Sequence, residues 1–163
     1  MKVIFLDVDG VLTHRLTVGR GRENTRVHRF LSQLDADCVE RLMEIVSRTG
    51  AKIVVSSTWR LHPHSMGALH AMARRARKRR LIYDKTGVCD IKRAGFHVPA
   101  RGIEISQWIE QHESVRGPLE SYVVIDDGHV EGHPMVLVKN GFDCGGLRDH
   151  HVQEAINILG EKT

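Results

Sequence analysis

Long hydrophobic runs are missing from the sequence. No apolar stretch approaches the roughly 18 residues that a transmembrane helix needs, so we expect no membrane span. The start, Met1-Lys2-Val3, leads into an apolar run with no signal-peptide cleavage region, and we expect no secretory leader. The three cysteines, Cys38, Cys89 and Cys144, are odd in number and widely spaced. They argue against a disulfide framework and predict a reduced, cytoplasmic protein.

Aromatic residues are also scarce, with four Phe, two Tyr and two Trp, which disfavours a base-stacking platform for single-stranded nucleic acid. The 163 residues fit one globular domain spanning 1–163.

The net charge of +4 is modest evidence for an anionic partner. Basic residues form two groups, Arg74, Arg75, Arg77, Lys78, Arg79 and Arg80, and Arg15, Arg20, Arg22, Arg26 and Arg29. They are either solvated surface charges or contacts for a phosphate-rich partner such as nucleic acid.

Hydrophobic patterning predicts alternating strands and helices. Residues 2–7, 51–55, 121–126 and 135–138 are typical of buried strands, and 81–83 of a short one. Helical spacing favours helices over 35–50, 66–76, 102–113 and 152–159. Residues 13–33 are polar and basic and indicate a surface excursion, whereas 84–100 give no clear prediction. This alternation predicts an α/β fold with a mostly parallel sheet and helices on both faces.

Two acidic clusters each follow a hydrophobic run. Asp7-Val8-Asp9-Gly10 follows residues 2–6, and Asp126-Asp127-Gly128 follows residues 122–125. Ligands of open α/β sheets bind at the carboxyl ends of the strands, and carboxylates brought together there need a divalent cation. Side chains two apart on a strand share a face, so Asp7 and Asp9 would enter one pocket, one as metal ligand and nucleophile and the other as proton shuttle. Gly10 would allow a sharp turn. The alternative is an acidic turn after an edge strand.

A hydroxyl cluster follows the second strand. Ser56, Ser57 and Thr58 could cradle a phosphoryl oxygen, with Arg60 as a bidentate phosphate contact. The alternative is a simple helix cap. Few carboxylates plus a substrate phosphate suit Mg²⁺.

These motifs, in this order, resemble the haloacid dehalogenase (HAD) superfamily. The stretch 7–13 (DVDGVLT) is the most diagnostic. The stretches 54–60 (VVSSTWR) and 101–108, together with Gly145-Gly146-Leu147, are similar to the small HAD domains of RNA-repair proteins. The resemblance implies a three-layer, Rossmann-like HAD core, with residues 13–33 as a minimal cap insertion.

The resemblance also implies roles for individual residues. Asp7 would form an aspartyl-phosphate, and Asp9 would protonate the leaving group and later activate water. Mg²⁺ would be bound by Asp7, the backbone carbonyl of Asp9 and Asp126, supported by Asp127. Ser56 would bind the transferring phosphoryl group, or Ser57 if the strand ends one residue later. Gly10, Ser57 and Arg60 would contact the substrate.

One position departs from the family pattern. The lysine that the family places before the last acidic strand is replaced by Arg101, with Lys92 and Lys85 upstream as alternatives. Arginine can neutralise phosphate, but its planar fork differs from an ammonium.

We therefore expect a Mg²⁺-dependent phosphatase that acts on a nucleotide or a nucleic-acid terminal phosphate. The alternatives are a small-metabolite phosphatase, in which the arginines are merely solvated, and a non-catalytic binding module with an inherited fold.

Overall fold

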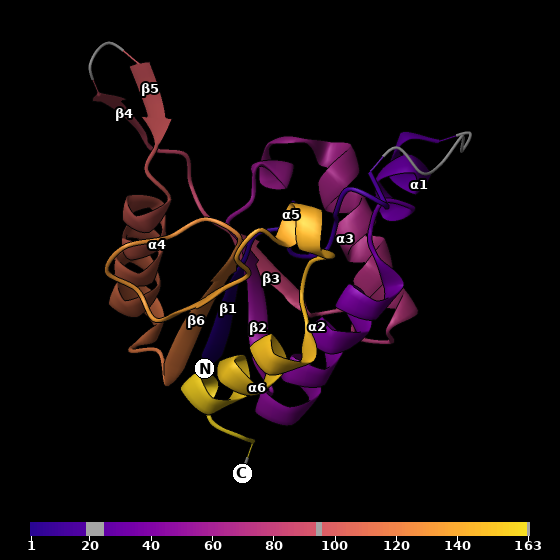
Figure 1. Cartoon of the computed structure of the whole chain (residues 1–163). Coiled ribbons are helices and arrows are strands. Elements are labelled where there is room, and N and C mark those ends of the chain that lie inside the picture. The colour runs from indigo at the N-terminus through magenta and orange to yellow at the C-terminus, as the bar shows by residue number, and fades with distance from the viewer. Residues whose placement is uncertain (19–24, 94–95, 163) are drawn as a thin grey trace.

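Five parallel strands form one sheet, in the order β3–β2–β1–β6–β7 (Figure 1). The computed structural model describes residues 1–18, 25–93 and 96–162. The strands are β1 (Lys2–Leu6), β2 (Lys52–Val55), β3 (Ile82–Lys85), β6 (Ser121–Asp126) and β7 (Met135–Leu137). Every neighbouring pair runs parallel. The predicted α/β fold with a Rossmann-like sheet is confirmed.

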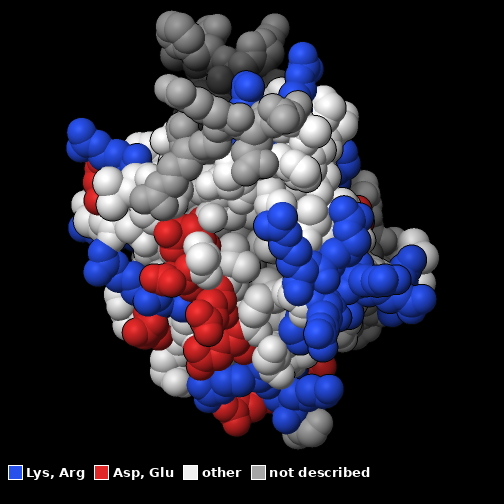
Figure 2. Space-filling view, turned by 90° about the vertical axis from the view of Figure 1, so that its right-hand side faces the viewer, with Lys and Arg blue, Asp and Glu red and all other residues white. Residues whose placement is uncertain are grey.

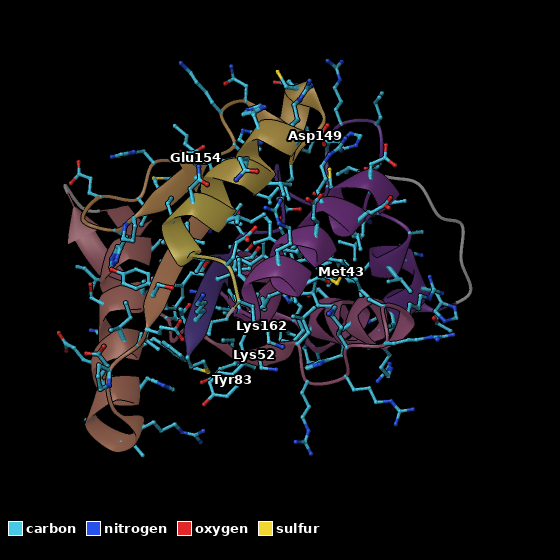
Figure 3. The ribbon with its side chains drawn as sticks, turned by 90° about the horizontal axis from the view of Figure 1, so that it is seen from below. Met43, Lys52, Tyr83, Asp149, Glu154 and Lys162 are labelled. Atoms are coloured by element: carbon cyan, nitrogen blue, oxygen red, sulfur yellow. The ribbon has the colours of Figure 1, made fainter. Side chains whose placement is uncertain are left out.

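Helices cover both faces of this sheet (Figure 3). On the central strand, Val3 and Phe5 point to the face covered by α4 (Arg101–Arg116), where Phe5 packs edge-on against Trp108 at 5.3 Å between ring centroids. Ile4 and Leu6 point to the other face and join a larger core. That core also takes in the buried sides of α2 (Ala36–Thr49), α3 (Pro63–Arg75) and α6 (Asp149–Leu159). The period-2 alternation of a strand thus divides a continuous apolar run between two cores.

The ends of α2 lie where the sequence predicts them. Asp35 is the N-cap, and its carboxylate accepts from the backbone N–H groups of Asp37 and Cys38. Gly50 ends the helix at φ 73°, the left-handed conformation that glycine tolerates best. The helix predicted over 102–113 is longer than predicted and extends to Arg116.

Two excursions leave the core at the carboxyl edge. The first contains α1 (Arg26–Leu31), which packs on α3. The second is a hairpin of β4 (Asp90–Arg93) and β5 (Phe96–Pro99), which projects above α4 in Figure 1. This hairpin falls within residues 84–100, for which the sequence gives no clear prediction. Short helical turns, η1 (Thr58–Leu61) and α5 (Gly141–Cys144), also lie at this edge.

Of the helices in the described residues, none has both the length and the apolar character to cross a membrane.

The register of the three central strands aligns their carboxyl ends. Leu6 is the partner of Val55 on one side and of Ile125 on the other. The next residues along the chain are therefore neighbours, namely Asp7, Ser56 and Asp126.

Candidate functional site

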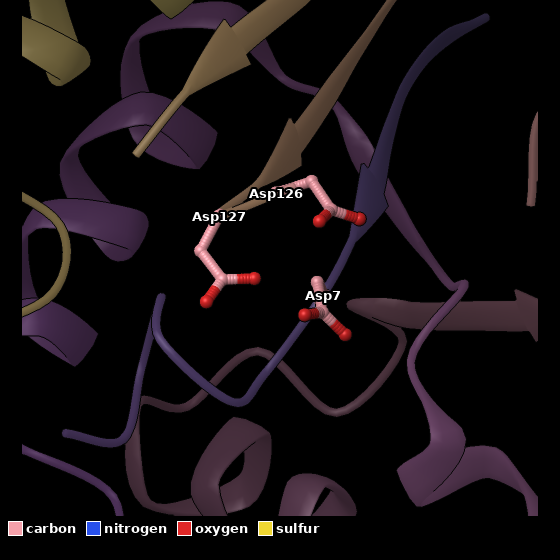
Figure 4. A group of neighbouring side chains, drawn as sticks. All are labelled: Asp7, Asp126 and Asp127. Carbon is pink, nitrogen blue, oxygen red and sulfur yellow. The ribbon is translucent and has the colours of Figure 1, made fainter. Parts of the chain in front are cut away.

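Three carboxylates converge at the carboxyl edge of the sheet (Figure 4). Asp7 and Asp126 are buried, Asp127 is half-buried, and one oxygen of each lies within 4.8 Å of the others. The backbone fixes this arrangement, because Asp7 N–H donates to Ile125 O at 2.9 Å and continues the ladder between β1 and β6. Asp126 Oδ1 accepts from the Gly128 N–H at 2.8 Å, which tightens the turn after β6.

Gly10 makes room for the third carboxylate. Its φ is +77°, and a Cβ built there would lie 2.2 Å from Asp127 Oδ2. Glycine is therefore required both by the backbone conformation and by the close approach of the Asp127 side chain. The structure assigns Gly10 a contact with this carboxylate, in addition to the turn that the sequence indicated.

Asp9 is held apart from the three carboxylates by two hydrogen bonds. Its Oδ1 accepts from Thr13 Oγ1 at 2.9 Å, and its Oδ2 accepts from Trp59 Nε1 at 3.0 Å. The side chain of Asp9 is exposed. Both oxygens are thus oriented by neighbours, as a group that donates and accepts protons requires. Trp59 is therefore a site residue. The sequence alone does not decide whether its side chain lies in the core or stacks on a base.

Arg101, the first residue of α4, lies among the carboxylates. Its Nη1 is 3.3 Å from Asp7 Oδ1 and also bonds Asp126 Oδ2. Burial disfavours the guanidinium, but Asp7 and Asp126 outweigh it and raise the pKa of Arg101 above its ordinary value. Of the two alternatives, Lys85 donates its Nζ to Arg60 O at 3.2 Å. Lys92 is on β4, and its side chain lies outside the described part of the structure.

The electrostatics of the site favour a bound cation. Burial raises the pKa of Asp7 to about 6, with Arg101 lowering it and Asp126 raising it. Burial and the charge of Asp126 also raise the pKa of Asp127. Three carboxylates and one guanidinium leave an uncompensated negative charge in a buried place. Oxygen ligands of this kind suit Mg²⁺, so the residues present fit the predicted metal.

The two serines after β2 have different surroundings. Ser56 N–H donates to Leu6 O at 3.0 Å, so the ladder continues one residue past the strand. The Ser56 hydroxyl is buried and has no hydrogen-bond partner among the described residues. The Ser57 hydroxyl caps η1 and interacts with Asp7, which lowers the pKa of that carboxyl. The structure thus brings the hydroxyl of Ser57, the alternative candidate, next to Asp7, the predicted nucleophile.

The prediction that Arg60 contacts phosphate needs correction. Arg60 is 5% exposed, and its donors are taken up within the protein. Nη2 pairs with Glu104 Oε2 at 2.7 Å, and Nη1 donates to the carbonyls of Ser56 and Ser57 at 2.7 and 2.9 Å. Nε and Nη2 both donate to Gly87 O. Arg60 therefore positions the backbone of Ser56 and Ser57. Glu104, which also accepts from the Cys89 N–H at 2.9 Å, was missed because nothing in its local sequence marks it.

The fold and the site together define a HAD-type domain. Residues 3–152 match the family model described as the HAD domain in Swiss Army Knife RNA repair proteins. The chain belongs to this family, which confirms the resemblance drawn from the motifs and supports a HAD hydrolase in general. The search of curated proteins and the search of solved structures found no match.

Proposed function

We propose that this protein is a Mg²⁺-dependent phosphatase that hydrolyses phosphoric monoesters through an aspartyl-phosphate. The convergence of Asp7, Asp126 and Asp127 around Arg101 at the carboxyl edge of the sheet carries this proposal. A site of this composition neutralises and orients a phosphoryl group.

The residues have distinct roles in this reaction. A carboxylate oxygen of Asp7 attacks phosphorus, the bond to the leaving oxygen breaks, and Asp9 donates its proton to that oxygen. Asp9 then takes a proton from water, the water oxygen attacks phosphorus, and the bond to Asp7 breaks to release inorganic phosphate. Arg101 neutralises the phosphoryl oxygens, and the Ser57 hydroxyl holds one of them.

Asp7, Asp126, Asp127 and the backbone carbonyl of Asp9 would hold Mg²⁺. When bound, the ion offsets the charge of the phosphoryl group and of the carboxylates.

For the substrate, we propose a nucleotide or a nucleic-acid terminal phosphate. The net charge of +4 and the RNA-repair context in the family description support this choice. The alternative is a small-metabolite phosphatase, and salt dependence separates the two. The affinity for a polynucleotide falls steeply with ionic strength, and that for a small ester falls less.

The decisive experiment is a substrate panel assayed with Mg²⁺ and with excess chelator. The panel contains terminally phosphorylated oligonucleotides, mononucleotides and an aryl phosphate. We expect Mg²⁺-dependent release of phosphate that is abolished in the Asp7→Asn variant. Turnover that survives in Asp7→Asn would be contamination, and the absence of release from every substrate would favour a non-catalytic binding module.

A further inference from the structure

The edge of the sheet opposite the carboxylates gathers basic side chains from four segments. A hollow of about 320 Å³ there is lined by Lys52 from the start of β2, by Lys78, Arg79 and Arg80, and by Lys162. Beside it, the end of α3 and the following turn carry further arginines. We call this surface the basic edge, and it consists of Lys52, Arg74, Arg75, Arg77, Lys78, Arg79, Arg80 and Lys162.

The fold accounts for the position of these residues. Because α3 begins just after η1 at the carboxyl edge, it returns antiparallel to the strands and ends at the amino edge. Arg74 and Arg75 occupy its last turn, where cations are favoured by the helix dipole. Arg77 adopts a left-handed conformation with φ 56°, and Lys78 N–H donates to Ala73 O at 2.8 Å. Buried Leu81 then anchors the chain before β3.

The tail of the chain completes the hollow. Lys162 N–H donates to Arg48 O at 2.7 Å, which holds this lysine beneath the sheet. Viewed from below, Lys52 and Lys162 lie close together (Figure 3).

Within the part of the chain that the structure describes, the charges of the basic edge have no acidic partners. Nearby acids already have other partners, since Glu120 pairs with Lys2, and Glu44 and Glu161 pair with Arg48. Lys and Arg gather on one side of the face in Figure 2, and Asp and Glu form a band beside them. Neighbouring like charges repel one another, and a bound anion offsets that repulsion.

We propose that the basic edge binds the sugar–phosphate backbone of a nucleic-acid strand. Most of its cations are arginines, whose planar forks bind phosphate oxygens in pairs. No large apolar side chain is exposed over residues 74–81, whereas an amphipathic membrane-binding helix adds apolar side chains inserted among the lipids to its cations. No Phe, Tyr or Trp occurs in that stretch either, so contacts to phosphate, independent of base sequence, account for the binding.

Binding there is spatially separate from hydrolysis. Lys52 begins β2 and Ser56 follows its end, a span of about 13 Å at the rise of a strand. The site at the carboxyl edge would take the terminal phosphate, and the basic edge attracts the rest of the backbone at the other edge. The nucleic-acid strand is therefore held by a surface that does not touch the phosphate to be removed. The affinity for nucleic acid and the turnover can then be changed independently.

The test is a salt series of binding measurements on the full chain. The probe is a fluorescein-labelled oligoribonucleotide of about 15 nucleotides, followed by fluorescence anisotropy. The variant replaces three exposed residues of the basic edge, Arg75→Gln, Arg79→Gln and Arg80→Gln. We expect its Kd to rise at least about tenfold and the slope of log K against log salt to fall by about two. These losses should be equal for probes of different sequence.

A matched variant, Arg15→Gln, Arg26→Gln and Arg29→Gln, removes the same charge from exposed positions at the other end of the molecule. It should keep most of the affinity. Equal losses in both variants, or none in the first, would overturn the proposal. Binding to vesicles that contain anionic lipid, without binding to the oligonucleotide, would overturn it in favour of a membrane. The assay needs no Mg²⁺ and no turnover, so an inactive protein that still binds the probe contradicts the proposed function alone.

Discussion

The indole Nε1 of Trp59 donates a hydrogen bond of 3.0 Å to Oδ2 of Asp9. Trp59 is 5% exposed and packs edge-on against Phe30 at 5.2 Å between ring centroids. Phe30 belongs to α1, in the excursion between β1 and α2. The carboxyl group proposed as general acid and base is therefore oriented by a core tryptophan, which is itself held by that excursion.

Replacing Trp59 with Phe should impair proton donation to the leaving group. The change keeps the aromatic packing and deletes the donor to Asp9. Turnover of an alkyl phosphate should fall about tenfold or more, because its leaving oxygen needs the proton. An aryl phosphate with an acidic phenol should lose much less, and steady-state kinetics on the two esters measure the difference. Equal losses on both would show that Trp59 only maintains the fold.

Replacing Arg101 with Ala should remove the charge that faces the phosphoryl group. We expect kcat to fall about 10²–10³-fold, with partial recovery in Arg101→Lys, since an ammonium restores the charge without the fork. Lys92→Ala is the comparison. If Arg101→Ala retained its turnover and Lys92→Ala lost it, the lysine would be the functional cation.

Gly10→Ala should displace Asp127. The new Cβ would meet Oδ2 of that residue, and the left-handed conformation adds about 1–2 kcal/mol for a non-glycine residue. We expect a weaker Mg²⁺ affinity by calorimetry together with a lower free energy of unfolding. Gly132→Ala is the control, because Gly132 has φ +79° but no atom of the described residues within 4 Å of a built Cβ. It should lose stability only, and an equal loss of Mg²⁺ affinity in both variants would contradict the role of Gly10.

The sequence predicts the parts of the site that depend on local patterns. The apolar runs before Asp7 and Asp126 indicate strands, and parallel strands bring the residues at their carboxyl ends to one edge. The Asp35 and Gly50 boundaries of α2 are equally local. Here the signal lies within a few residues of the feature that it predicts.

The parts that the sequence did not predict depend on contacts across the fold. Trp59 is fifty residues from Asp9 in the sequence. Arg60, in η1, pairs with Glu104, which lies far along the chain in α4. Whether Ser56 or Ser57 is the phosphate ligand depends on where the hydrogen-bond ladder between β1 and β2 ends. A difference of one residue exchanges the two, and apolar patterning does not locate the end of a strand that closely. The β4–β5 hairpin stands outside the sheet and carries no sustained alternation of apolar residues.

Breaking the Arg60–Glu104 pair should be strongly destabilising. Both side chains are buried, and Glu104→Gln would leave the guanidinium without its counter-charge. We expect a loss of about 3–5 kcal/mol in the free energy of unfolding from urea titration. Glu161→Gln is the matched control at an exposed pair with Arg48 and should change stability little. A loss in Glu104→Gln no larger than in the control would show that Arg60 does not need this partner.

The stability of the fold should fall in acid because of His151. This side chain is 7% exposed, and its Nδ1 accepts from the Arg148 N–H at 3.0 Å, which requires an unprotonated nitrogen. Burial, reinforced by His150 and Arg148, lowers its pKa from 6.5 to about 4. The unfolded chain therefore binds the proton more readily, and the stabilisation is present above pH 6.5 and is lost as the pH falls towards 4.

Urea titrations at several pH values measure this loss. Between pH 7 and 4, the wild-type protein should lose up to about 3 kcal/mol more than His151→Gln, whose side chain does not titrate. The control is His64→Gln, at an exposed position near the start of α3, which should retain the wild-type dependence. Carboxylates also titrate in this range but do so in all three proteins, so only the difference reports on His151. Identical pH profiles for wild type and His151→Gln would show that the buried imidazole does not control acid stability.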